Sequence, residues 1–254
     1  MWNQQQMSAL IDIFLDFGEA MLSAGGEIGR VEDSLARLGA AYGATKTNVF
    51  VITSSIELTL RFADGESITR TCRINRAGGT DFVMLGRLNA LSRRCVASRL
   101  PIEDVAQEIA QIKQNRVRPI KFYCGSVLAA FAFSLFFGGS FWDALASGAF
   151  AVLICFLQDK IAELMPNRVF FLFITSLLTG IGVCLLARVV PSLQIDKIII
   201  GDIMLLVPGI AITNAVRDTL IGDTISGLVK LADSLAWAAA LAAGFMLAMF
   251  LFAG

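Results

Sequence analysis

The segment from Gly201 to Lys230 holds the residues best suited to chemistry inside a membrane. It reads GDIMLLVPGIAITNAVRDTLIGDTISGLVK, and Pro208-Gly209 interrupts its apolar run. A broken helix at membrane depth is tolerated only where protein or a watery cavity satisfies the freed backbone groups. A helix that restarts after Gly209 would direct its positive N-terminal dipole at the midplane, as transporters do to hold a substrate carboxylate. The break therefore predicts a substrate site, although a kink in a packed helix would use the same residues.

Polar side chains flank this break. Thr213 and Arg217 share a helix face at i, i+4, and so do Asn214 and Asp218. Asp202 lies before the break and could carry a proton or pair with a cation. Arg217 would be the partner of a substrate carboxylate, and the open alternative is that Arg217 and Asp218 are charges at the membrane interface.

A second string, GGEIGRVEDS, occupies residues 25–34. Helical spacing places Ile28 and Val31 on the face of a helix that packs against a core, so Arg30 and Glu32 lie on other faces of that helix. The pattern alone favours a solvated face for these charges. No GxGxxG or GxxxxGK occurs in the chain, which excludes a glycine-rich phosphate loop.

The residue inventory argues against an enzyme. The chain has no histidine, which removes imidazole catalysis and nearly every zinc site, and its five cysteines include no CxxC pair. The formal net charge is zero, so nothing indicates a nucleic-acid partner. We expect no catalytic residue, no metal and no cofactor. The open alternative is a hydrolase in the N-terminal domain that uses Ser-Lys or carboxylate chemistry.

Residues 1–116 are predicted to form a cytoplasmic α+β domain. On its second helix, Asp33 and Arg37 are expected to pair at i, i+4. Between the helices, Ile56 to Phe62 alternates apolar and polar residues, as a half-buried strand does. The expected elements are helices at 8–23, 28–42, 81–99 and 101–115 and an antiparallel sheet from 47–53, 56–62 and 68–74.

Residues 117–254 are predicted to form a membrane domain, which makes the chain an α-helical integral membrane protein with a soluble N-terminal domain. The sequence is 56% hydrophobic and only 17% charged, with a mean hydropathy of +0.70. About five transmembrane helices are expected, at 119–138, 141–158, 168–190, 198–216 and 233–253.

The basic residues between these spans predict the orientation. One side carries Lys113, Arg116, Arg118, Lys121, Lys160, Arg168, Arg217 and Lys230. The other side has only Arg188 and Lys197. The positive-inside rule then predicts a multi-pass protein of the cytoplasmic (inner) membrane, with its N-terminal domain in the cytoplasm and its C-terminus outside.

The strings GGEIGRVE (25–32) and LLVPGIAITNAVRDTLIGDTISGLVKLADS (205–234) resemble the hallmark segments of the threonine/serine exporter (ThrE) family. The resemblance covers essentially the whole chain. Since single-chain members carry a second membrane module, this chain resembles the large component of the family's split two-component form. Matching positions of the first string are Gly26, Arg30 and Glu32. Those of the second are Pro208, Gly209, Asn214, Arg217, Asp218, Gly222, Asp223 and Gly227.

The resemblance implies export of small carboxylate-bearing metabolites. Threonine and serine are implied for the single-chain type and succinate for the split type. A small multispan membrane protein of the same family is the implied partner, and a homo-oligomer stays open. The remaining alternative is a regulatory subunit whose partner forms the whole pathway.

Overall fold

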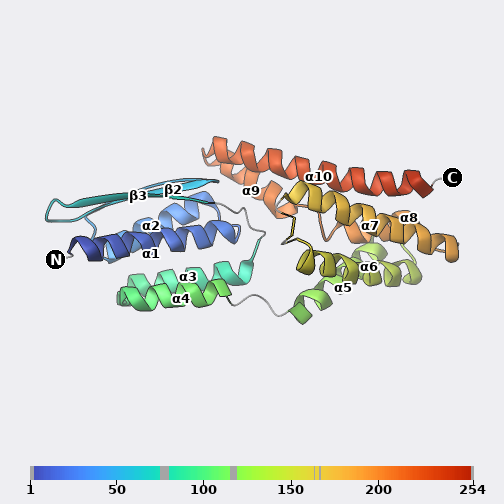
Figure 1. Ribbon diagram of the computed structural model, residues 1–254, viewed down its shortest axis with the longest axis horizontal. Helices are drawn as coiled ribbons and strands as arrows, with labels where there is room; N and C mark the ends of the chain where they lie inside the picture. The colour runs from blue at the N-terminus through green and yellow to red at the C-terminus, as the bar shows by residue number, and fades with distance from the viewer. Residues whose placement is uncertain (1–2, 75–79, 115–118, 163, 166, 253–254) are drawn as a thin grey trace. The chain divides into compact units, whose positions relative to one another are not determined.

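The computed structural model describes residues 3–74, 80–114, 119–162, 164–165 and 167–252 (Figure 1). The described residues form two compact units. The first contains residues 1–116 and 210–231, and the second contains residues 117–209 and 232–254. Each unit is described by itself.

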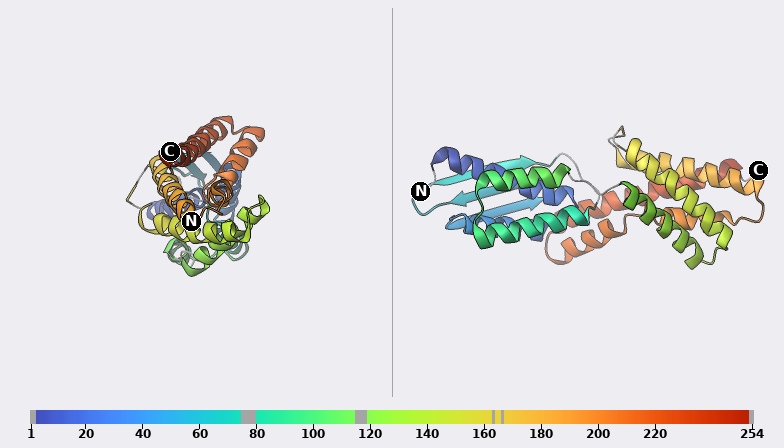
Figure 2. Two further views of the ribbon diagram at one scale, coloured as in Figure 1. Left: turned by 90° about the vertical axis from the view of Figure 1, so that its right-hand side faces the viewer. Right: turned by 90° about the horizontal axis from the view of Figure 1, so that it is seen from below.

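Helices α1 to α4 and a three-stranded sheet form the N-terminal part of the first unit. The sheet, the α1–α2 pair and the α3–α4 pair lie in successive layers (Figures 1 and 2). The elements are α1 (Gln4–Ser23), α2 (Ile28–Ala41), β1 (Lys46–Ile52), β2 (Ser55–Arg61), β3 (Ser67–Arg73), α3 (Phe82–Ser98) and α4 (Ile102–Gln114). The predicted α+β character of this region is confirmed, since each expected helix and strand is present with small changes at its ends. The expected end of the fourth helix, residue 115, lies outside the described residues.

Alternating hydrophobicity sets the sheet. Its order is β1-β2-β3, with antiparallel pairing that places Leu58 opposite Val49 and Arg70. Ile56, Leu58 and Leu60 are fully buried, whereas Glu57 and Arg61, on the opposite face, are exposed. Because the period of a strand is two, the apolar set faces the α1–α2 layer.

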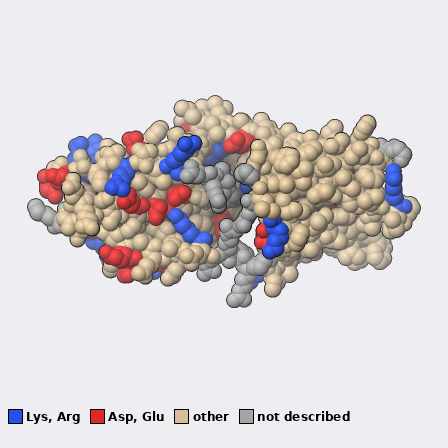
Figure 3. Space-filling view, in the orientation of Figure 1, with Lys and Arg blue, Asp and Glu red and all other residues tan. Residues whose placement is uncertain are grey.

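The second unit consists of apolar helices. Among the described residues, three helices are long and apolar enough to cross a membrane: α6 (Phe141–Lys160), α7 (Arg168–Val189) and α10 (Thr224–Phe252). The shorter apolar helix is α5 (Pro119–Phe136). Figure 3 shows charged side chains gathered over the first unit, while the visible face of the second is almost free of them.

The predicted interruption near residue 208 is present. Helix α8 (Ile195–Ile203) ends five residues before Pro208, and α9 (Gly209–Leu220) begins directly after it. Proline has no N–H for a helical hydrogen bond and clashes with the preceding turn, so it begins a helix more readily than it continues one. Residues 210–231, which follow the break, belong to the first unit.

Candidate functional site

The turn before α2 depends on two glycines. Gly25 has φ +82°, and its N–H donates to the carbonyl of Leu22, while the N–H of Gly26 donates to that of Met21 at 2.8 Å. This pair of bonds is a Schellman cap that ends α1. A Cβ on Gly26 would stand 2.7 Å from the Met21 carbonyl oxygen, so a side chain does not fit there. The turn fixes where the next residue, Glu27, begins α2.

Glu27 joins the first string to the second. The Nη1 atom of Arg217, on α9, donates to Oε1 of Glu27 at 2.6 Å. The side chain of Glu27 is 20% exposed and that of Arg217 is 55% exposed. Arg217 was predicted to bind a substrate carboxylate. In the structure it binds the carboxylate of Glu27 from the same chain.

A tight hairpin connects α9 to α10. Gly222 has φ +104°, which suits the left-handed turn, and the N–H of Asp223 donates to the carbonyl of Asp218 at 2.9 Å. A Cβ on Gly227 would meet the Oγ1 atom of Thr219 and would lie 2.8 Å from the carbonyl oxygen of Ala215. Glycine at 227 thus lets the backbones of the two helices come close.

A buried ion pair closes the same hairpin. The Nζ atom of Lys230 donates to Oδ2 of Asp218 at 2.6 Å, and the side chain of Asp218 is fully buried. The other oxygen, Oδ1, has no hydrogen-bond partner among the described residues. Asp218 therefore holds α9 and α10 together.

Arg30 and Glu32 lie apart from this pair on α2. Oε1 of Glu32 accepts the backbone N–H of Val51 at 3.1 Å, which ties α2 to the edge strand β1. Burial raises the pKa of Glu32, the Val51 N–H lowers it, and the nearby Asp223 carboxylate raises it again, with a net rise. Arg30 is exposed and lines a groove between α2 and α3.

Among its described residues, the second unit contains two fully buried acids, Asp143 and Asp202. Asp143, in the first turn of α6, accepts hydrogen bonds from the backbone N–H and the hydroxyl of Ser140 and from the backbone N–H of Gln194.

Asp202, on α8, is fully buried, and Oγ of Ser147 on α6 donates to its Oδ1 at 2.9 Å. Its Oδ2 atom has no hydrogen-bond partner, and no salt bridge reaches Asp202, among the described residues. The neighbouring Gly201 allows this contact, because a Cβ there would lie 2.7 Å from the carbonyl oxygen of Ala130 on α5.

A second buried hydroxyl lies beside Gly201, the residue that precedes this acid. The buried Oγ of Ser134, on α5, has no partner among the described residues, and the Cβ of Ser134 lies 3.1 Å from the Cβ position built on Gly201. Three helices, α5, α6 and α8, thus place a carboxyl group and two hydroxyls in one apolar interior. Such a set can bind and release a proton, because a buried carboxylate without a cation is costly. Within the described part of the chain, no group of His, Cys, Asp and Glu could hold a metal ion.

A family model described as "Putative threonine/serine exporter" (ThrE) matches residues 12–252. The chain belongs to this exporter family. No curated protein and no solved structure matches it. The resemblance of the two strings to this family is confirmed, and membership favours a transporter over an enzyme.

In this exporter-family chain, the structure brings together part of the predicted site. Within the first unit, Arg217 meets the turn that contains Gly26, and Asp218 lies in the adjoining hairpin. Asp202 and Pro208 belong to the second unit. Thr213 and Asn214 lie on α9, exposed and partly buried respectively. The functional assignment of all these residues stays a prediction.

Sequence reasoning missed three residues that complete these contacts. They are Glu27, Ser147 and Lys230. Glu27 follows the glycine pair directly, so its position at the start of α2 could have suggested it. Ser147 is a hydroxyl residue inside an apolar helix, where such side chains often bond across helices.

Proposed function

We propose that the chain is a subunit of a secondary exporter for small carboxylate-bearing metabolites of the threonine and serine type. Family membership supports the substrate class. The observation that carries the transport role is Asp202, a fully buried acid held by one serine hydroxyl and by no cation among the described residues. An ionisable residue inside a membrane domain marks an ion or proton pathway more often than a packing site.

Asp202 would serve as the proton carrier. In its protonated form it is neutral and could donate to an acceptor from Oδ2, while Ser147 continues to donate to Oδ1. Loss of the proton leaves a charge that the described surroundings do not neutralise, so release must accompany water entry or a conformational change. This requirement would couple the proton to the opening of the pathway.

Arg217 would provide the anchor for the substrate carboxylate. Its guanidinium is about half exposed, and within the described part of the chain it is held by one hydrogen bond, to Glu27, so donors remain open to a second carboxylate. A substrate could then compete with Glu27 for the same fork. Such an exchange would act as a gate, in which the Arg217–Glu27 contact opens when a substrate carboxylate replaces that of Glu27.

We place the N-terminal domain in the cytoplasm. Five crossings, made by α5, α6, α7, α8 with the break that follows it, and α10, would put the C-terminus outside. This orientation puts six described basic residues on the cytoplasmic side: Lys113, Lys121, Lys160, Arg168, Arg217 and Lys230. Arg116 and Arg118, which were predicted on the same side, lie outside the described residues. Alkaline phosphatase fused to the C-terminus should be active, because the enzyme would then lie outside the cell. If this fusion is inactive while GFP fused at the same position is fluorescent, the C-terminus lies in the cytoplasm and the proposed orientation is wrong.

A small multispan protein of the same family is the proposed partner. The test is efflux from cells preloaded with labelled threonine, serine or succinate, with the chain expressed alone and with that partner. Efflux of threonine or serine only with the partner supports the proposal, and preferred efflux of succinate assigns the subunit to dicarboxylates instead. No efflux of any label, with both proteins confirmed in the membrane, would overturn the transport role.

A further inference from the structure

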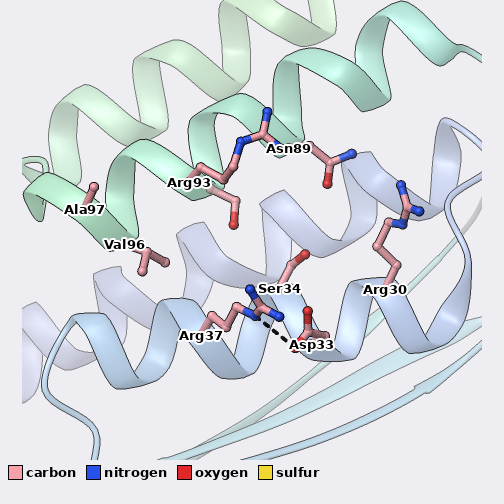
Figure 4. A pocket seen from close by; sticks show the side chains of 9 residues that line it. Arg30, Asp33, Ser34, Arg37, Asn89, Arg93, Val96 and Ala97 are labelled. Carbon is pink, nitrogen blue, oxygen red and sulfur yellow. Dashed lines mark hydrogen bonds and ion pairs between the residues drawn. The ribbon is translucent and has the colours of Figure 1, made fainter.

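A groove between α2 and α3 collects polar side chains in the first unit (Figure 4). Its volume is about 410 Å³, within the range of small-molecule sites. Arg30 and Arg37 reach it from α2, and Arg93 and Asn89 reach it from α3. The groove therefore draws its side chains from two packed helices rather than from loops, which holds their backbones in place.

The charge of the groove is positive. Arg37 is bonded to Asp33 by its Nε at 3.0 Å, as the sequence predicted. Arg30 and Arg93 have no ion pair and no hydrogen bond with any described residue. Three arginines against one aspartate leave a net charge of +2, which favours a ligand with two negative charges over a zwitterion.

Neutral hydrogen-bonding groups line the same groove. Ser34 and Ser92 are each only 7% exposed, and Asn89 is partly buried. None of the three side chains has a hydrogen-bond partner among the described residues. Since buried polar groups are normally paired, these donors are available to a bound molecule.

We infer that this groove binds a small dianion, a dicarboxylate or a phosphate, through the guanidinium groups of Arg30 and Arg93. Guanidinium forks match both carboxylate and phosphate oxygens, and the two serine hydroxyls and the amide would complete the shell. The groove belongs to the first unit, whereas Asp202 belongs to the second. This inference stands independently of the proposed export function.

The test is calorimetric titration of the purified full-length protein in detergent, at constant ionic strength, with succinate, inorganic phosphate or threonine. Succinate or phosphate should bind, and Arg93→Gln and Arg30→Gln should each weaken binding by about tenfold or more. Arg87→Gln is the matched control, because Arg87 is exposed on α3 outside the groove. Asp202→Asn should bind as the wild type does, which separates this site from the transport pathway.

Three results would overturn the inference. The first is the absence of binding heat with both dianions. The second is an equal loss in Arg87→Gln and Arg93→Gln, which would show general charge screening. The third is threonine binding as tightly as succinate and phosphate, which would contradict selection for two negative charges. Unchanged thermal unfolding of each variant shows that the fold is intact.

Discussion

Asp218 in the first unit and Asp202 in the second are both fully buried, but they have different partners. In the first unit, Asp218 is bonded to Lys230. In the second, Asp202 is equally buried but is met by a hydroxyl rather than a cation among the described residues. A paired carboxylate stabilises a helix contact, whereas an unpaired one is costly and persists where its titration is used. The comparison separates a structural role, for Asp218, from the proton-carrier role that we propose for Asp202.

The largest effect is expected at Asp202. Asp202→Asn keeps an acceptor for the Ser147 hydroxyl but cannot exchange a proton, so efflux with the partner should fall at least about tenfold while the protein stays folded. Asp196→Asn is the control, since Asp196 lies on the same helix but is 65% exposed. Equal efflux from both variants would remove the distinction between the two units.

The Asp218–Lys230 pair should show the largest stability effect. Lys230→Met leaves a buried carboxylate without its cation, and the free energy of unfolding should fall by about 3 kcal/mol. Adding Asp218→Asn should restore most of this loss, because the uncompensated charge is gone. Thermal unfolding in detergent measures both, and a double variant as unstable as the single one would contradict a charge effect.

Close packing at Gly227 comes next. Gly227→Ala would push a methyl group against Thr219 and the Ala215 carbonyl, and overpacking of this kind costs about 1–3 kcal/mol. Gly86→Ala is the control, since nothing lies within 4 Å of the added Cβ in α3. That control should be neutral or stabilising by about 0.5–1 kcal/mol, because alanine favours helices over glycine. Similar unfolding temperatures for the two variants would argue against close helix contact.

The Glu27–Arg217 pair should matter more for efflux than for stability. Because Arg217 is half exposed, Glu27→Gln or Arg217→Gln should change the free energy of unfolding by only about 0.2–1 kcal/mol. Both should reduce efflux. Asp12→Asn, which removes a similarly exposed pair with Arg70, should leave efflux unchanged. Full efflux by Arg217→Gln would exclude its proposed substrate role.

The smallest effect is expected at Glu32. Its raised pKa means that the folded state binds the proton more tightly than the unfolded state. Ionisation of Glu32 therefore opposes folding at neutral pH, and stability should rise as pH falls through the folded pKa toward the ordinary value. Glu32→Gln keeps an acceptor for Val51 and should remove this slope, with a change below about 0.5 kcal/mol at neutral pH. Unfolding curves at several pH values test it, and an unchanged slope would contradict it.

The helices and strands of the N-terminal α+β region could be predicted because local periodicity encodes them. Ile56, Leu58 and Leu60 alternate with polar residues, and the resulting strand is observed. The Glu27–Arg217 contact joins residues 190 positions apart, and no local pattern specifies such a partner. The hydrogen bond from Ser147 to Asp202 could not be predicted either. The sequence of an apolar helix does not tell which helix the face that carries a serine will contact. The family motifs drew attention to the two strings, while only the fold showed which of their side chains meet.

The most direct test is proton movement during efflux, measured in proteoliposomes that contain the chain and its proposed partner. An internal pH dye should report proton flux in step with threonine or serine transport by the wild type. We predict that Asp202→Asn abolishes this flux together with net transport. Undiminished transport and proton flux in Asp202→Asn would contradict the assignment of Asp202 as the proton carrier.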